Sequence, residues 1–246
     1  MKNHNLNELT LLAGVDIEFI NKKGNRFCFH IPTILESYTS NYDYDYFIGC
    51  MITPMDEICT KLNQPLMTRL EFIKQAIYRK KNDTAYTLSF KHFMNVVFKK
   101  EIRMVDDWLL DNNYVIDDQV MDFLSYVLAV NTGTEKLEDV QKELSSNVKK
   151  TPEELEWDRL MREQQKQINK VKNKFTDSKL TVDLMIAAVM REFKMSIEEL
   201  MNKNFYFIRY FYRACLKIDA YSLNLIAEGN GNVDAKKHKH KYWVNM

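Results

Sequence analysis

The scarcity of glycine and proline is the feature that most restricts the folds open to this chain. Its 246 residues include only 6 Gly and 4 Pro. Gly supplies the positive φ of tight turns and Pro interrupts helices, so a chain poor in both should have few tight turns and much helix. With 46% hydrophobic residues, it has enough apolar material for one large domain or two small ones.

Charge and cysteine usage exclude several classes of protein. The formal net charge is +1, so no global field attracts nucleic acid or a membrane surface. The 4 Cys form no C-x-x-C pair and do not cluster with His, which disfavours a structural metal and fits free thiols in a reducing cytosol. The N-terminus lacks the apolar core of a signal peptide, and no apolar run approaches the roughly 18–20 residues of a membrane span. We expect no membrane association and no cofactor.

Residues 1–131 are predicted to form an α+β N-terminal domain. Residues 15–20 and 26–31 alternate with period two around Gly24, which predicts a β-hairpin. Residues 105–116 predict a second hairpin that turns at 111–113. Capping signals and apolar stripes predict helices over 32–38, 53–62, from 68 onward, 87–99, and from 117 to about 131. The signals include a Thr68–Glu71 capping box, Asp117 as an N-cap, and Asn131-Thr-Gly133 as the stop of the last helix.

Finer expectations concern single side chains of this domain. Tyr46, Phe47 and Cys50 are expected to face the core, with the Tyr hydroxyl reaching solvent. Thr53 is expected to cap the helix that Pro54 begins. His92 lies beside an apolar stripe, where a hydrogen-bonded boundary residue is a better interpretation than a ligand or base.

Residues 132–178 are predicted to be a charged connector followed by a long amphipathic helix. Residues 133–150 are predicted to be a mobile connector that could include a frayed helix. Thr151 begins a helix that runs to about Lys174. The apolar positions of this helix are mostly three to four residues apart: Trp157, Leu160, Met161, Ile168, Val171 and Phe175. Such a stripe docks either on its own domain or on a partner, and both interpretations stay open.

Residues 179–246 are predicted to form a C-terminal helical domain with a basic tail. The expected helices cover 182–193, 196–201, 205–217 and a fourth from Asp219 to just before Gly229. A Ser196–Glu199 capping box should begin the second, and Asn204 should cap the third. Residues 205–212 are nearly all aromatic or apolar, which predicts almost complete burial. The fold class is therefore mainly α with small β-hairpins: an α+β N-terminal part and an all-α C-terminal part.

The tail is the most concentrated basic feature. The tail could bind nucleic acid, with its lysines on phosphates and its tryptophan on a base, or it could bind an acidic partner. The residues concerned are Lys236, Lys237, Lys239, Lys241 and Trp243. A solvated tail anchored by its Trp explains the same residues. His238 and His240 have no nearby carboxylate or Cys, so no metal site is expected.

Catalytic motifs are missing from the sequence. The carboxylate pairs stand at expected turns or helix starts, where acids stabilise the positive helix end, and none makes an acid/base pair. No phosphate-binding Gly-rich loop, nucleophile elbow or zinc-protease motif occurs. We expect no catalytic residue and no enzymatic activity.

A family resemblance rests on several segments in one order. They are His30-Ile-Pro-Thr-Ile, Tyr46-Phe-Ile-Gly-Cys-Met-Ile-Thr-Pro, Val189-Met-Arg-Glu-Phe-Lys-Met-Ser-Ile-Glu-Glu-Leu, and Gly229-Asn-Gly-Asn-Val-Asp-Ala-Lys-Lys. The chain resembles tail assembly chaperones of tailed phages from low-GC Gram-positive bacteria and their relatives. This resemblance implies a non-enzymatic protein of the host cytoplasm that binds the tape measure protein during tail morphogenesis, and also leaves room for self-association.

The client-binding residues we expect lie on the amphipathic helix, at Trp157, Leu160, Ile168 and Val171, because an apolar helix face suits a long helical client. Two rival functions remain. One is a structural component of the tail or connector in the virion. The other is a nucleic-acid-binding protein, since 182–217 has the outline of a helix-turn-helix unit; core packing explains its aromatic third helix better.

Overall fold

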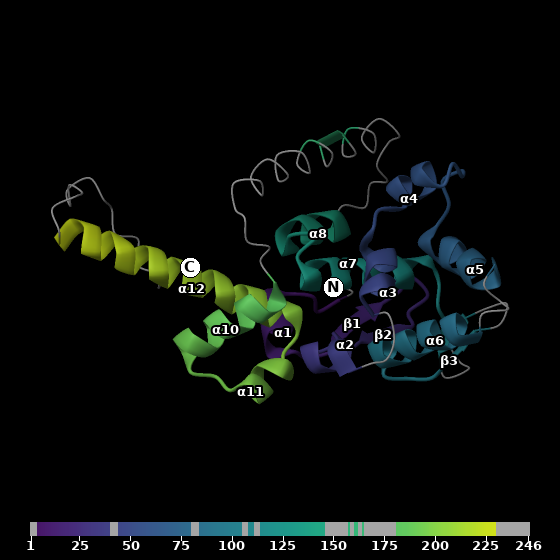
Figure 1. Ribbon diagram of the computed structural model, residues 1–246. Coiled ribbons are helices and arrows are strands. Elements are labelled where there is room, and N and C mark those ends of the chain that lie inside the picture. Colours follow the sequence, from purple (N-terminus) through teal and green to yellow (C-terminus); the bar gives the residue numbers. More distant parts are fainter. Residues whose placement is uncertain are drawn as a thin grey trace.

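Helices dominate the computed structural model, which describes residues 4–39, 44–79, 84–104, 108–110, 114–145, 157, 160, 161, 164 and 181–229 (Figure 1). Strands in these residues form only two small antiparallel sheets. The predicted fold class, mainly α with small β-hairpins, is confirmed.

The described residues up to 145, here called the N-terminal body, hold most of the elements. The helices are α1 (Glu8–Ala13), α2 (Ile34–Thr39), α3 (Tyr44–Ile52), α4 (Met55–Lys61), α5 (Arg69–Arg79), α6 (Thr84–Phe98), α7 (Asp118–Thr132) and α8 (Leu137–Ser145). The strands are β1 (Ile17–Ile20), β2 (Arg26–Phe29), β3 (Ile102–Met104), β4 (Trp108–Leu110) and β5 (Tyr114–Val115). The C-terminal unit consists of α10 (Val182–Phe193), α11 (Ile197–Met201) and α12 (Phe205–Gly229).

The first hairpin forms as its alternating pattern predicts. β1 and β2 pair antiparallel, with Ile17 opposite Phe29, and Gly24 in the turn has φ +80°. One face of the pair carries large apolar side chains that are almost completely buried: Ile17, Phe19, Phe27 and Phe29. The hairpin is therefore held by one buried face, as expected for a small antiparallel sheet.

The second sheet is larger than the sequence indicated. β4 and β5 form the predicted hairpin, whose turn residues 111–113 lie outside the described part. β3, which was not predicted, adds a third strand beside β4. Its side chain Ile102 is fully buried, and its N–H donates to the Asn95 side chain of α6 at 2.9 Å. Three residues carry too little alternation to reveal such a strand.

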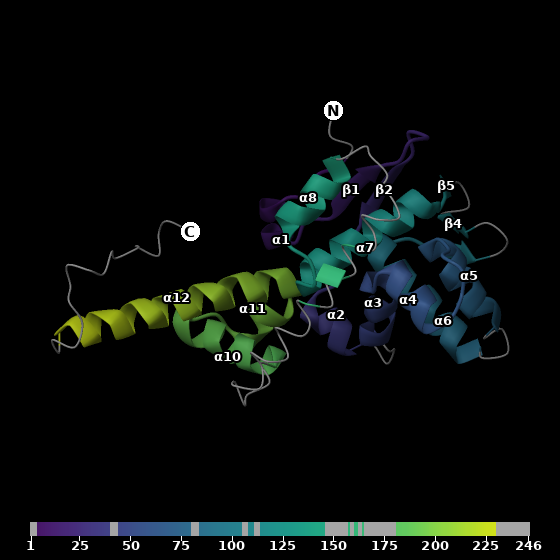
Figure 2. The same ribbon diagram turned by 90° about the horizontal axis from the view of Figure 1, so that it is seen from above.

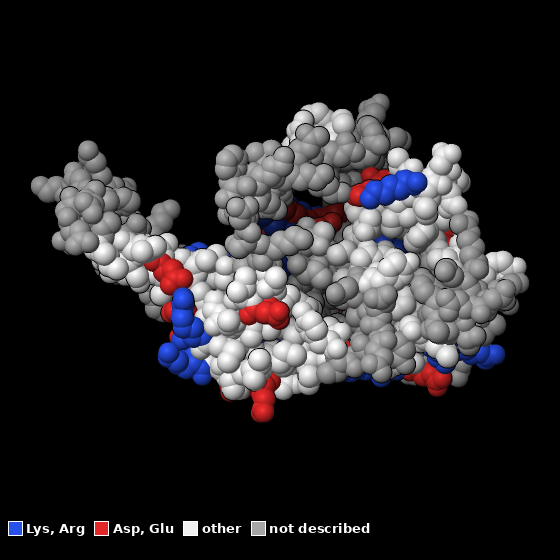
Figure 3. Space-filling model, in the orientation of Figure 1, with Lys and Arg blue, Asp and Glu red and all other residues white. Residues whose placement is uncertain are grey.

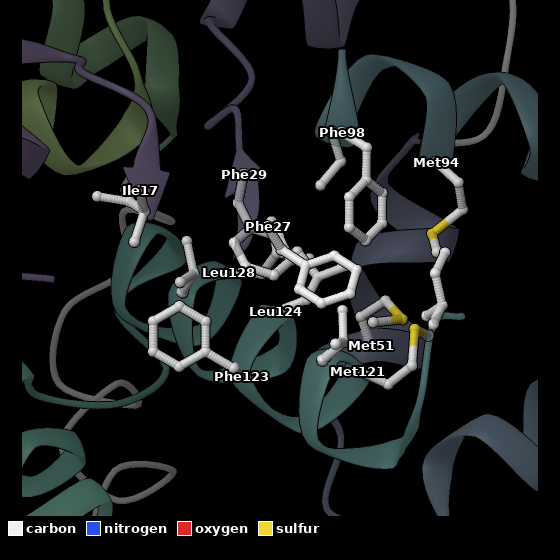
Figure 4. Packing of buried hydrophobic residues seen from close by; sticks show 14 of the residues in the cluster. Ile17, Phe27, Phe29, Met51, Met94, Phe98, Met121, Phe123, Leu124 and Leu128 are labelled. Carbon is white, nitrogen blue, oxygen red and sulfur yellow. The ribbon is translucent and has the colours of Figure 1, made fainter. Parts of the chain in front are cut away.

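Helix α7 is the centre of the N-terminal body. Asp117 caps its first turn and Gly133, with φ +76°, ends it, both as predicted. The helix buries side chains over most of its circumference and leaves Asp118 and Asp122 exposed on the remaining side. Phe123 stacks on Phe19 with ring centroids 4.4 Å apart. Figure 4 shows α7, the first hairpin and α6 converging on this core. A helix that buries most of its circumference needs partners on several sides, which explains why strands and other helices pack around it.

Of the expectations about caps and burial in this part of the chain, two are confirmed and two are wrong. Thr68 and Glu71 form the predicted capping box at α5. Thr53 does not cap α4, because its hydroxyl donates back to the Gly49 carbonyl of α3 at 2.7 Å. Phe47 is buried as expected, whereas Tyr46 leaves half of its surface exposed. Because apolar residues occur on every side of this helix, the sequence does not show which of two adjacent positions is exposed to solvent.

The region predicted to be a mobile connector contains a packed helix. In α8, Val140 is fully buried in the same hydrophobic cluster as α7. The Gln141 side chain also donates to the Leu6 carbonyl near α1 at 3.1 Å. Residues 137–145 therefore belong to the N-terminal body. The charged side chains Glu138, Asp139 and Lys142 lie on the exposed face of α8, and Val140 is its buried residue.

The C-terminal unit differs from expectation in one major respect. The Ser196–Glu199 capping box of α11 and the Asn204 cap of α12 form as predicted. The break expected between 217 and 219 is absent, and α12 is one helix of 25 residues. Figures 1 and 2 show its C-terminal half projecting away from the rest of the described chain.

Burial in α12 is also lower than predicted. In its first turns Ile208 is fully buried, whereas its aromatic neighbours, such as Phe207 and Phe211, are only partly covered. The unit's own hydrophobic cluster joins α10, α11 and α12, and takes Ile34 from α2 of the N-terminal body. The cluster is therefore completed by a side chain from the other part of the molecule.

Candidate functional site

The amphipathic helix expected to bind a client is exposed where the structure describes it. Trp157, Leu160 and Met161 are helical and leave 64%, 44% and 48% of their surfaces accessible. Their spacing of three and four residues places them on one side of a helix. Ile168 and Val171 lie outside the described residues, as do the tail residues Lys236, Lys237, Lys239, Lys241 and Trp243.

A second exposed apolar surface, which the sequence analysis missed, lies on the C-terminal half of α12. Its exposed side chains are Leu216, Leu223, Leu225 and Ile226, with exposures from 44% to 66%. Leu184 of α10 is exposed as well. Because we expected a break after Lys217, this stretch was divided between two short helices, and its exposed apolar side chains, which face several sides of the helix, were not considered together.

The beginning of α12 is fixed in a polar junction with the N-terminal body. Asn204, 3% exposed, donates to the Leu11 carbonyl at the end of α1 (2.8 Å) and accepts from the Phe207 N–H (2.9 Å). Asn131, 1% exposed, accepts from the Tyr206 N–H at 3.0 Å. Buried amides with partners on both sides make such a junction specific, because an unsatisfied buried polar group is costly.

Arg209 completes this junction at the C-terminal end of α7. Its guanidinium donates to the Asn131 carbonyl and lies directly over Gly133, where a Cβ would collide with it. Burial, and then the neighbouring charge of Arg213, lower the pKa of Arg209. A cation at the C-terminal end of α7 interacts favourably with the helix dipole, so Arg209 serves to dock α12 on α7.

Helix α2 forms the third side of the junction. The Ile34 N–H donates to the Lys203 carbonyl at 2.9 Å, and Thr33 forms a bridge with Asn204. The start of α2 is in turn held by Glu36, which accepts from the Thr33 N–H at 2.8 Å and contacts His30 at 3.0 Å. Partial burial opposes it, but the hydrogen bonds from Thr33 and His30 lower the pKa of Glu36.

His30 lies between two carboxylates. Its Nδ1 is 3.1 Å from Asp16 and its Nε2 is 3.0 Å from Glu36. Lys99 also contacts Asp16 at 3.1 Å. This group ties β1, β2, α2 and the end of α6 together. In the interactions described, no Ser, Cys or Lys nucleophile is hydrogen-bonded to the imidazole. We therefore interpret the group as a contact that holds these elements together.

Arg69 is a buried charge of the N-terminal body. Its guanidinium donates to the Cys50 and Thr53 carbonyls, at 2.8 and 3.0 Å. Burial lowers the pKa of Arg69, and the nearby Asp122 opposes that change. Burial likewise raises the pKa of Asp122. The guanidinium thus satisfies the end of α3, where helix carbonyls lack partners of their own.

Neither a metal cluster nor a membrane span is found in the described residues. No group of three or more His, Cys, Asp or Glu side chains there could hold a metal ion. In the same residues, no helix is both long and apolar enough to cross a membrane. On the face shown in Figure 3, the described charged side chains are scattered and of both signs, with no extended patch of one charge.

Comparisons with known proteins give no relative: no protein family, no curated protein and no solved structure matches the chain.

Proposed function

We propose that this protein is a non-enzymatic phage tail assembly chaperone, which binds the tape measure protein while the tail subunits assemble around it. The proposal joins the segment resemblance to one structural observation. Apolar helical surfaces remain exposed on a molecule whose N-terminal body is well packed. Exposed apolar patches of this kind suit protein partners.

The client site we propose is the exposed stripe of the amphipathic helix. Trp157, Leu160 and Met161 are about half exposed or more, so these positions are not used up by packing on the protein's own core. An aromatic anchor beside aliphatic side chains is typical of the centre of a binding surface. Ile168 and Val171 continue the same spacing and complete the proposed stripe.

Co-expression with the phage's tape measure protein tests this placement. The double variant Trp157→Lys/Leu160→Lys should lose client capture, because two charges would have to be desolvated on binding. Leu88→Lys on α6 is the matched control, since Leu88 is 57% exposed on the N-terminal body. Capture that is unchanged in the double variant would contradict the placement of the client site.

A structural component of the virion is the first alternative. The exposed surfaces would then contact other tail or connector proteins permanently. Mass spectrometry of purified particles separates the two functions, because a chaperone is absent from finished particles and a component is present at fixed stoichiometry.

A nucleic-acid-binding function is less well supported by the helices 182–217. The first turn of α12 faces α1 and α7 through Asn204 and Asn131, so it is not available to enter a groove. Helix α11 carries Glu198 and Glu199, which phosphates would repel. A steep loss of DNA affinity with salt, and again on deleting 236–246, would support this function through the tail.

A further inference from the structure

We propose that the amphipathic helix pairs antiparallel with the same helix of a second copy of this chain, along the face that carries Trp157, Met161 and Gln164. The pairing goes beyond the proposed function and does not depend on the identity of the client. Only its effect on client binding rests on that function.

The apolar positions of this helix follow the repeat of a coiled coil. Trp157, Met161 and Gln164 are four and then three residues apart, and all three are helical. Beyond the described residues, the sequence continues the same alternation of four and three through Ile168, Val171 and Phe175. This alternation marks the seam along which one helix supercoils with another. Apart from Leu160, the apolar residues from 157 to 175 keep to this narrow seam, whereas a helix that covers a globular core carries a wider stripe.

The seam is uncovered where the structure describes it. Trp157 and Met161 leave 64% and 48% of their surfaces accessible, and Gln164 is exposed as well. In the described residues, neither hydrophobic cluster includes any of these three side chains. The described part of the seam is therefore available to a second helix.

The charges beside the seam identify the partner and its direction. The flanking positions change from acidic through neutral to basic along the helix, in the order Glu153, Asp158, Leu160, Gln165, Gln167, Lys172 and Lys174. Such flanking charges set partner choice and orientation in coiled coils. A second copy in antiparallel orientation presents this order reversed, so that acids meet lysines at both ends. A parallel copy would bring the acids of both helices to one end and the lysines to the other. The order of charges is thus complementary to itself in the antiparallel direction, as a symmetric contact requires.

One register brings apolar side chains opposite each other along most of the seam. The opposite positions are Trp157 with Phe175, Met161 with Val171, and Gln164 with Ile168, each pair occurring twice by symmetry. Only the central pair is mixed, and a single polar position in a seam specifies the register at a cost in stability. A shift of one heptad towards the start of the helix would bring Glu154 against Val171, which disfavours that alternative.

The same register pairs the charges. Asp158 of each copy lies beside Lys172 of the other, and the aliphatic stem of Lys174 covers Leu160. Exposed ion pairs add little affinity, and the seam from 157 to 175 is shorter than three heptads. The dimer should therefore be weak and concentration-dependent.

This pairing would regulate the client site of the proposed function. Trp157 and Met161 belong both to the seam and to the surface assigned to the client, so a client helix has to displace the second copy. The dimer keeps the apolar stripe covered until a client is present, which reduces non-specific association through exposed apolar side chains.

Sedimentation velocity of the full chain without a client, from about 1 to 200 µM, tests for the dimer over the range in which a small interface dissociates. The wild type should shift from monomer to dimer. Met161→Lys should stay monomeric, because it places a charge in the seam, and should fold normally, because Met161 is exposed in the monomer. The control Leu88→Lys should dimerise like the wild type. A wild type that is monomeric throughout, or a Met161→Lys variant that still dimerises, would overturn the proposal.

A charge exchange tests the direction and the register. Lys172→Asp should weaken the dimer roughly tenfold, because two acid–acid contacts replace two ion pairs. Asp158→Lys/Lys172→Asp should restore it. In a parallel pair the two positions would lie about 21 Å apart along the axis, so no rescue would occur. Lys166→Asp, the same change on the outer face of the helix, is the control and should leave the dimer intact.

A double variant that dimerises no better than Lys172→Asp would contradict the antiparallel register. Both measurements are made without a client, whereas the test of the proposed function measures client capture. A protein that captures its client but never dimerises would refute the pairing alone, and one that dimerises without capturing the client would refute the proposed function alone.

Discussion

The N-terminal body and the C-terminal unit bury their apolar side chains to very different extents. In the described part of the body, fully buried side chains greatly outnumber partly buried ones around α7. In the C-terminal unit the partly buried members outnumber the buried ones, and one buried member, Ile34, comes from α2 of the body. The body is thus a self-sufficient core, whereas the unit depends on its neighbours.

This difference connects packing to function. A region that buries its side chains completely contributes stability but offers little to a partner. A region that keeps apolar side chains at its surface retains that free energy for binding. The exposed apolar side chains of the amphipathic helix and of α12 lie outside the body, which agrees with the use of such surfaces for binding and of the body for stability.

Truncating an aromatic side chain in each region should give the largest contrast. Phe123→Ala removes a ring that stacks on Phe19 and contacts Phe29, and should lower the free energy of unfolding by about 3–5 kcal/mol. Phe211→Ala, in the partly exposed cluster of α12, should cost about 1–2 kcal/mol, because less surface leaves water on folding. Urea denaturation of both variants measures the difference. Equal losses would refute the contrast between the regions.

A pair of glycine substitutions tests the junction between the regions. Gly133→Ala should lower the free energy of unfolding by about 2–3 kcal/mol. The new Cβ would be strained on a left-handed backbone and would also displace Arg209 from the end of α7. Gly14→Ala is the matched control, since Gly14 also has a positive φ, +66°, but no atom lies near its Cβ. It should cost only about 1 kcal/mol.

The same pair should also differ in where the structure loosens. Amide hydrogen exchange in the first turns of α12 should accelerate in Gly133→Ala and remain slow in Gly14→Ala. If both variants behaved alike, Arg209 would have no part in holding α12 on α7.

Acid should weaken the α2 side of the junction through Glu36. The folded pKa of Glu36 is lowered from its ordinary value of 4.5. Its contribution to stability is therefore complete above that value and is lost as the pH falls from there through the lower folded pKa. Because 42% of the side chain is exposed, solvent screening limits the contribution to about 1 kcal/mol or less.

Glu36→Gln provides the comparison for this pH effect, since glutamine can keep the capping box without the charge. Thermal melts between pH 7 and pH 3 should fall less steeply below pH 4.5 for the variant than for the wild type. Parallel curves would show that other carboxylates account for the acid sensitivity.

The smallest effect is expected at Leu223, in the last turns of α12. Leu223→Lys should change the free energy of unfolding of the monomer by no more than about 0.5 kcal/mol, because the side chain already faces solvent. Chemical denaturation at low protein concentration measures it. A loss comparable to that of Phe211→Ala would mean that this leucine is needed for folding.

Local signals allowed much of the fold to be predicted from the sequence. The caps at Asp117, Thr68, Ser196 and Asn204 all form, because each depends on residues within one turn. The break expected near Ile218 was wrong, since Asp219 is equally compatible with a helix interior when it pairs with Arg191. The burial of aromatic positions in α12 was overestimated, because composition does not reveal how many neighbours a helix has.

The junction could not be predicted in the same way. Asn131 looked like part of a helix stop, and nothing in the sequence links it to Tyr206, 75 residues away. The contact between Asn204 and Leu11 spans 193 residues. The stripe at 157, 160 and 161 was apparent from spacing, whereas its exposure depends on which surfaces the rest of the fold leaves uncovered.

The reach of those asparagine contacts has a consequence for synthesis on the ribosome. Helix α1 is made well before α12, yet the end of α1 and the start of α12 are joined by Asn204. The carbonyl of Leu11 gains this partner only after the 193 residues that separate it from Asn204 have been translated. The body therefore condenses first, and α12 docks onto a finished surface in a final step.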